Sequence, residues 1–142
     1  EKSGMKEQVT IQSFDWRTLQ LVQELAPHLD TVYLTAQQNW LNNVKPEGDQ
    51  ASAWTAGFIL SKYKNVPAMV KAAGGDVWSP FYGDLTEALV KDAQAIGLKV
   101  IPWTVNDPET MAKLIDTGVD GLISDYPDKL RAVAAEKSLP LP

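Results

Sequence analysis

Short apolar runs alternate with longer helical patterns along the whole chain. Five runs have the length and the β-branched, aromatic or alternating character of strands. They cover residues 9–14, 31–36, 75–83, 98–105 and 119–125. The runs are short and mostly apolar, which is typical of parallel strands that are covered on both faces.

The segments between these runs carry helix signals. Helices are predicted at 15–27, 84–97, 106–118 and 126–137. Asp15 and Asp107 stand where amino-terminal caps belong, and Pro108 suits the first helical position. Gly97 and Gly118 follow helices at positions where a left-handed residue ends the last turn.

One segment breaks the alternation. Residues 37–58, QQNWLNNVKPEGDQASAWTAGF, are rich in Asn, Gln and Gly and predict a long irregular excursion. Short helices are expected in or after it, at 58–64 and 66–74. Trp40 and Trp54 lie on this excursion, and the sequence leaves open whether they form a lid over a site or a hydrophobic patch.

Strands that alternate with helices predict a parallel sheet with right-handed crossovers. A doubly wound open sheet and part of a (β/α)8 barrel both fit this order. The sequence has no Gly-rich phosphate loop of either nucleotide-binding type, which disfavours a nucleotide site.

Composition narrows the class of protein. The 142 residues, 44% hydrophobic and 22% charged, suit one globular domain, and the net charge of −5 disfavours nucleic acid as a partner. Cysteine is absent, which excludes disulfides and thiolate chemistry. No apolar run approaches a membrane span, and the polar start, EKSGMKEQ, is unlike a signal peptide. The compartment, cytoplasmic or beyond the inner membrane, stays open.

The carboxyl ends of the predicted strands hold the candidate site, because function gathers there in parallel architectures. Aromatic and small hydroxyl side chains dominate these ends. They are Ser13, Phe14 and Asp15; Thr35, Ala36 and Gln37; Ser79, Phe81 and Tyr82; Trp103, Thr104 and Asn106; and Ser124, Asp125 and Tyr126. This set predicts a pocket for a ligand with an apolar face and a few hydroxyls.

Three stretches carry a family resemblance. IQSFDWRTLQLV, VWSPFYGDLT and VIPWTVNDPETMAKLIDTGVDGLISDYPDKL together resemble the C-terminal portion of the glycerophosphodiester phosphodiesterases. The resemblance implies a (β/α)8 TIM barrel of which this chain supplies approximately strands four to eight with their helices. Residues 1–142 would then be the C-terminal part of a single barrel domain, with a long loop or insertion near 37–65.

The resemblance also implies an activity: hydrolysis of glycerophosphodiesters to glycerol 3-phosphate and an alcohol, with a divalent metal, Ca or Mg. The family's His-Arg pair, second His and metal-binding carboxylates belong to its first three strands, and none of these motifs occurs here. The lone His28, in LAPHLD, is expected at the surface or at a helix end. We therefore assign no catalytic residue and no metal ligand to this chain, and we expect the isolated chain to be inactive.

Trp103, Phe14 and Tyr82 are the candidate substrate-binding residues, with core packing as the alternative interpretation of each. Asn106 and Asp107 are expected to cap the helix that follows them. Asp125 is expected to cap the last helix or to hold a neighbouring loop, and a metal role for it is disfavoured.

An incomplete barrel predicts a partner. Five strands cannot close a barrel of eight, so strands 9–14 and 119–125 would each present an unpaired edge. The N-terminal half of the barrel, or a second copy of this chain, is expected to complete the fold. The alternative function is a non-catalytic, barrel-derived binding or scaffold domain.

Overall fold

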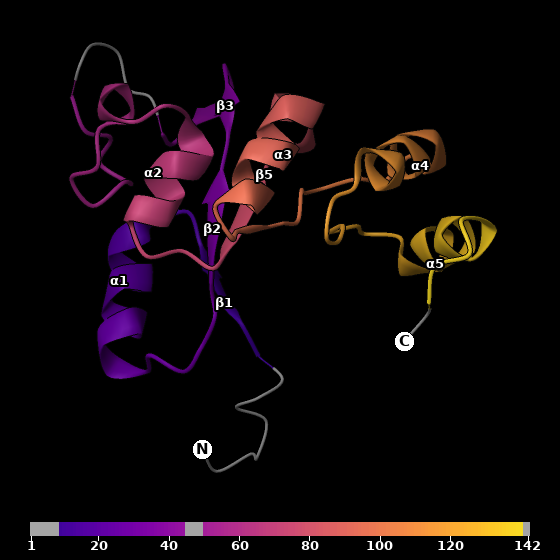
Figure 1. Cartoon of the computed structure of the whole chain (residues 1–142), viewed down its shortest axis with the longest axis horizontal. Coiled ribbons are helices and arrows are strands. Elements are labelled where there is room, and N and C mark those ends of the chain that lie inside the picture. The colour runs from indigo at the N-terminus through magenta and orange to yellow at the C-terminus, as the bar shows by residue number, and fades with distance from the viewer. Residues whose placement is uncertain (1–8, 45–49, 141–142) are drawn as a thin grey trace.

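A parallel sheet forms the centre of the fold, as predicted (Figure 1). The computed structural model describes residues 9–44 and 50–140. The sheet has the order β1-β2-β5-β6 and every pairing in it is parallel. Its strands are β1 (Ile11–Ser13), β2 (Thr31–Thr35), β5 (Val77–Pro80) and β6 (Lys99–Val100), each shorter than its apolar run.

Five α-helices connect and flank these strands in the described part of the chain. They are α1 (Trp16–Leu25), α2 (Val66–Ala72), α3 (Glu87–Ala95), α4 (Pro108–Thr117) and α5 (Pro127–Glu136). The predicted caps are confirmed: Asp15 accepts from the Arg17 N–H before α1, and Asp107 accepts from the Thr110 N–H at 2.8 Å in α4. Gly118 ends α4 with a φ of +89°, a left-handed conformation that glycine adopts without strain. The hydrogen bonds that the backbone N–H and the hydroxyl of Thr110 donate to Asp107 keep the pKa of Asp107 below its ordinary range.

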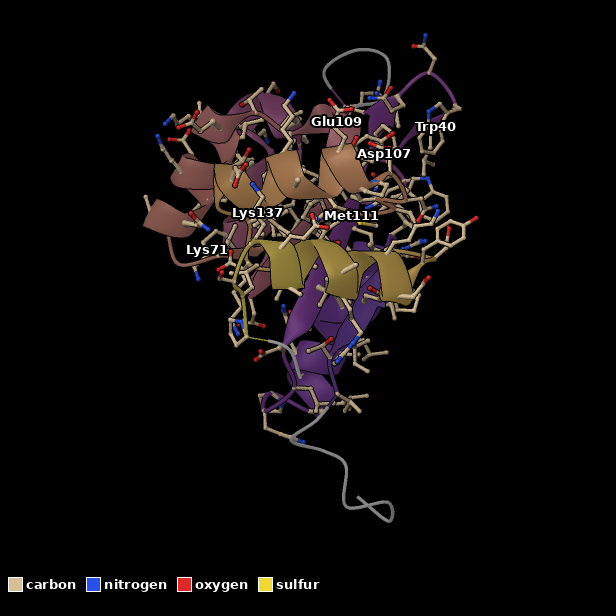
Figure 2. The ribbon with its side chains drawn as sticks, turned by 90° about the vertical axis from the view of Figure 1, so that its right-hand side faces the viewer. Trp40, Lys71, Asp107, Glu109, Met111 and Lys137 are labelled. Atoms are coloured by element: carbon tan, nitrogen blue, oxygen red, sulfur yellow. The ribbon has the colours of Figure 1, made fainter. Side chains whose placement is uncertain are left out.

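Two clusters of apolar side chains hold the helices on the sheet. In the larger, α1, α2 and α3 pack over one row of the sheet, in which Tyr33, Trp78 and Val100 lie side by side in register. In the smaller, Met111 and Leu114 of α4 meet Val133 of α5, which lies alongside it (Figure 2). An ion pair of 2.6 Å between Lys137 and Asp116 joins these two helices.

The predicted strand at 119–125 is wrong as a regular element. Its segment runs beside β6 and the residues after it, and three backbone bonds connect them: Asp120 N to Val100 O, Ile123 N to Pro102 O, and Val105 N to Ile123 O. Pro102 has no N–H, so the ladder bond that would come next is missing. The pairing then shifts by one residue at Leu122, and no strand is formed there.

Apart from residues 45–49, which lie outside the described part of the chain, the excursion after β2 is more ordered than predicted. It begins with a small antiparallel hairpin of β3 (Gln37–Gln38) and β4 (Leu41–Asn42). The helix expected at 58–64 is reduced to a 3-10 turn, η2 (Leu60–Lys62). No described helix has the length and apolar character that crossing a membrane requires.

Candidate functional site

Five aromatic side chains gather where the parallel strands end, and we call them the aromatic wall. They are Phe14, Trp40, Phe81, Tyr82 and Trp103. Trp103 is central: its ring lies 5.3 Å from that of Phe14, 5.6 Å from Phe81 and 6.2 Å from Trp40, centroid to centroid. The contacts of Trp103 with Phe14 and Trp40 are close to perpendicular, at 89° and 83°, an arrangement that aromatic pairs favour.

Backbone hydrogen bonds fix the middle of the wall. Beyond the regular strands the ladder continues through a bridge between Phe81 and Trp103. The N–H of Phe81 donates to Thr35 O at 2.7 Å, and the N–H of Trp103 donates to Pro80 O at 3.0 Å. The indole N–H of Trp103 also donates to Ser79 O at 3.0 Å, so the ring is oriented by the sheet itself.

A buried amide holds the hairpin at the carboxyl end of β2. The side chain of Asn43 is fully buried, and its Oδ1 accepts from the Ala36 N–H at 2.9 Å. Its Nδ2 donates to Leu34 O at 3.0 Å and to Phe14 O at 3.3 Å. This one side chain therefore ties the returning chain after β4 to the ends of both β1 and β2.

Polar groups cross-link the end of the segment after β6 to the end of the 119–125 segment. Asn106 does not cap α4, contrary to expectation, because Asp107 already occupies that position. Its Oδ1 instead accepts from the Asp125 N–H at 3.0 Å and from the Ser124 hydroxyl at 3.2 Å, and its Nδ2 donates to the Asp125 carboxylate at 2.9 Å. Asp125 thus holds the neighbouring loop, one of its two expected roles, and α5 has no side-chain cap bond.

The structure brings two of the three candidate residues into direct contact and places the third one ring away. Phe14 packs on Trp103, whereas Tyr82 packs on Phe81 at 4.7 Å and is 37% exposed. Substrate binding by these residues stays a prediction. The candidate set did not include Phe81 and Trp40. Phe81 stood among the strand-end residues, and Trp40 was expected either in a lid over a site or in a hydrophobic patch.

Trp40 and Trp54 separate in the structure. Trp40 packs edge-on against Phe81 at 5.1 Å while remaining 61% exposed. Among the described residues Trp54 makes no ring contact with the wall, and its carbonyl accepts from the Trp16 N–H at the start of α1.

The described residues do not fit a divalent metal ion. Among residues 9–44 and 50–140, no three His, Asp or Glu side chains lie close enough together to hold one. Of the carboxylates at the strand ends, Asp15 is paired with Arg17 and Asp125 accepts from Asn106. His28 is exposed and precedes β2, so it lies toward the other end of the sheet from the wall. This part of the chain can bind a ligand through rings, hydroxyls and amides, but we derive no metal-dependent step from it.

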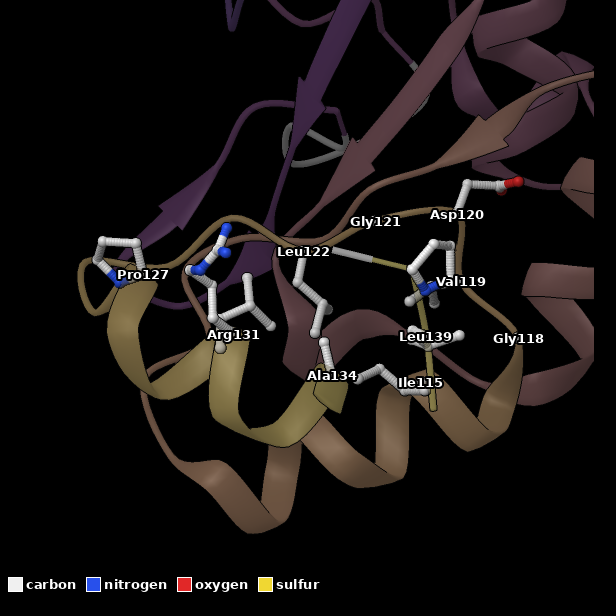
Figure 3. Close-up of a pocket in the computed structure, with 12 residues that line it drawn as sticks. Ile115, Gly118, Val119, Asp120, Gly121, Leu122, Pro127, Arg131, Ala134 and Leu139 are labelled. Atoms are coloured by element: carbon white, nitrogen blue, oxygen red, sulfur yellow. The ribbon is translucent and has the colours of Figure 1, made fainter. Parts of the chain in front are cut away.

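An apolar cavity lies beside the 118–122 segment. A cavity of about 770 Å³ opens between the 118–122 segment, α4 and α5 (Figure 3). Its lining is mostly apolar and includes Ile115, Val119, Leu122, Leu130 and Ala134.

Comparison with known proteins points to one family. Residues 2–129 match the model of the glycerophosphoryl diester phosphodiesterase family. A glycerophosphodiester phosphodiesterase of Caldanaerobacter subterraneus subsp. tengcongensis is 30% identical over 127 residues, which are 89% of this chain and 42% of that protein. A Bacillus subtilis protein of the same name is 31% identical over 126 residues, 89% of this chain and 36% of that protein.

Solved structures agree with this assignment. A structure from Silicibacter pomeroyi DSS-3, whose name places it among these phosphodiesterases, superposes with a TM-score of 0.79 at 32% identity and covers 97% of this chain. An Oleispira antarctica phosphodiesterase in complex with the product sn-glycerol-3-phosphate superposes with a TM-score of 0.62 at 22% identity and covers 87% of this chain. This chain corresponds to 41% and 40% of those two chains, so it spans less than half the length of its relatives. The neighbours imply a TIM-barrel-like α/β fold, and the chain belongs to the glycerophosphoryl diester phosphodiesterase family.

Proposed function

We propose that this chain supplies approximately strands four to eight of a (β/α)8 barrel that hydrolyses glycerophosphodiesters to glycerol 3-phosphate and an alcohol. The observation that carries the proposal is the aromatic wall, which lies at the carboxyl ends of parallel strands in a chain of this family. Phe14, Tyr82 and Trp103 are the proposed substrate-binding residues. Their rings suit the carbon skeleton of a glycerol or alcohol group, and the hydroxyl of Tyr82 can donate a hydrogen bond to an oxygen of the ligand.

The acid-base and metal chemistry is proposed to come from the rest of the protein. A divalent cation, Ca or Mg, would stabilise the charge that develops on the phosphodiester. The residues described here offer neither a carboxylate cluster nor a histidine near the wall. The contribution of this chain is to bind and orient the substrate.

The groove between the 118–122 segment, α4 and α5 is proposed as the seat of the completing half of the barrel. Two features of the structure favour this occupant. The groove is lined by Leu122, Leu130 and other apolar side chains (Figure 3). It lies beside the 119–125 segment, which bonds to the chain around β6 on one side and would pair with a further strand on the other. The Caldanaerobacter protein and the Silicibacter chain are each more than twice as long as this chain, which leaves enough residues for the remaining strands.

Activity assays test the division of labour. Glycerophosphocholine is offered with Ca²⁺ or Mg²⁺ to the isolated chain and to the complete protein. We expect turnover by the complete protein and none by the isolated chain. Turnover by the isolated chain that is abolished by a substitution within residues 1–142 would contradict the proposal, as would an inactive complete protein, which would favour a binding or scaffold role.

Sedimentation equilibrium tests the completion of the barrel. We expect the isolated chain to associate with itself or to bind a separately expressed N-terminal half. The substitution Leu122→Arg in the groove should weaken that association at least about tenfold. Leu25→Arg is the matched control, because Leu25 is 77% exposed on α1, away from the groove. A monodisperse, cooperatively melting monomer that ignores the other half would refute the assignment.

A further inference from the structure

The hairpin that carries Trp40 is too small to hold its own shape. β3 and β4 have two residues each, and even longer isolated hairpins are marginally stable in water. Trp40 lies at the turn, 61% exposed, and nevertheless rests edge-on against Phe81 and Trp103. Contacts outside the hairpin must therefore fix it in this position.

Two polar side chains supply these contacts. Asn43 holds the base of the hairpin through its buried amide. The second side chain is Asp84, whose Oδ2 accepts from the Gln37 N–H at 2.8 Å and whose Oδ1 accepts from Gln38 Nε2 at 2.5 Å (bonds across 47 and 46 residues of sequence). Hydrogen bonds to a carboxylate are roughly twice as strong as those between neutral groups, so Asp84 is a firm anchor for β3.

Asp84 also lies close in the chain to two residues of the aromatic wall, Phe81 and Tyr82. It ends the short 3-10 turn η3 (Tyr82–Asp84), which begins with Tyr82 and follows Phe81 directly. Its own backbone N–H donates to Phe81 O at 3.0 Å. One short turn after β5 thus positions Tyr82 and, through the Asp84 carboxylate, the hairpin that brings Trp40 to the same rings.

We propose that Asp84 is a positioning residue for the phosphodiester site, and that it holds Trp40 in the aromatic wall as a further substrate-contact residue. This inference rests on the function proposed above. With the anchor in place the ring is ordered before the ligand arrives, so binding does not have to bear the entropy cost of ordering it. Without the anchor that cost falls on substrate binding and leaves the chemical step unchanged.

The first test observes Trp40 directly and needs no activity. The complete protein is labelled with 5-fluorotryptophan, and the ¹⁹F resonances of its tryptophans are assigned with single Trp→Phe variants. We expect Asp84→Ala to move and broaden the Trp40 resonance and to shift that of Trp103, whereas the Trp16 and Trp54 resonances stay in place. Gln38→Ala removes one of the two bonds without leaving a bare carboxylate, and it should move the Trp40 resonance in the same direction by a smaller amount. An unmoved Trp40 resonance in both variants would overturn the proposal.

The second test uses kinetics of the complete protein with glycerophosphocholine. Asp84→Ala should raise KM about tenfold with kcat within twofold, and Asp84→Asn, which keeps one acceptor oxygen, should fall between it and the parent. The matched control is Asp92→Ala, because Asp92 of α3 accepts from Lys64 and Asn65 away from the wall. A KM effect of equal size in Asp92→Ala would overturn the positioning role. A complete protein without phosphodiesterase activity would refute the proposed function alone, since the resonance test of the hairpin would still stand or fall by itself.

Discussion

The substitution Asn43→Ala should lower the free energy of unfolding far more than the loss of a single amide side chain usually does. It removes the partner of three backbone groups at once, namely Ala36 N–H, Leu34 O and Phe14 O. A buried backbone group left without a partner costs about 1–3 kcal/mol, and water entering the vacated space would satisfy part of the set. We therefore expect the free energy of unfolding to fall by about 4 kcal/mol, a large fraction of the total stability of an ordinary domain.

Urea titration of the complete protein, followed by tryptophan fluorescence, measures this difference. Asn39→Ala is the matched control: it makes the same chemical change in the same hairpin, but Asn39 is exposed at the turn, where substitutions usually change stability by no more than about 0.5 kcal/mol. The reasoning would be refuted if Asn43→Ala and Asn39→Ala unfolded within about 1 kcal/mol of each other. That result would mean that the three backbone groups find other partners, and that the hairpin is not held by this amide.

Two further predictions concern single rings. Trp103→Ala should raise KM for the phosphodiester and should lower the free energy of unfolding by less than a core Trp does, because the ring is only partly buried at a strand end. A loss of about 3–5 kcal/mol, as for a core Trp, with KM unchanged would show that packing is its whole role. Burial raises the pKa of Tyr33 to about 12, above the value of the unfolded side chain. The contribution of the neutral Tyr33 side chain to the free energy of unfolding is therefore complete below pH 10 and is lost as the pH rises toward 12. Comparison with Tyr33→Phe by urea titration between pH 9 and pH 12 should reveal a loss of roughly 2–3 kcal/mol that the variant lacks, and parallel curves for the two proteins would contradict this.

The features that the sequence predicted correctly depend on neighbours in the chain. Asp107, Pro108 and Gly118 each act within one helix, so their residue types and spacing identify both ends of α4. The order of strands and helices follows in the same way from apolar runs and their separators. The rule that parallel strands end at one edge of the sheet was enough to place Phe14 and Trp103 near each other, whereas their role in substrate binding stays a prediction.

The features that the sequence did not predict depend on distant partners. The hairpin at 37–42 shows no strand pattern, because its stability comes from Asp84, more than forty residues away, and from the buried amide of Asn43. The apolar run at 119–125 has the right composition for a strand, but its neighbour carries Pro102, which cannot donate the bond that regular pairing needs. Pro102 was visible in the sequence, yet only the structure reveals where in the 119–125 segment its missing N–H interrupts the pairing.

The wall also bears on the shape of the sheet. Phe14 follows β1 and Trp103 follows β6, and these strands lie at opposite edges of the order β1-β2-β5-β6. Neighbouring strands are about 4.8 Å apart, so in a flat sheet three spacings would separate the two strands by about 14 Å. Side chains that stand perpendicular to a flat sheet would remain about that far apart, whereas the two ring centroids lie 5.3 Å from each other. The sheet must therefore curve so that its strand ends converge, which is the geometry of a barrel mouth. The same curvature that a barrel requires thus assembles the aromatic wall, and the contact between Phe14 and Trp103 connects the family fold to the proposed substrate site.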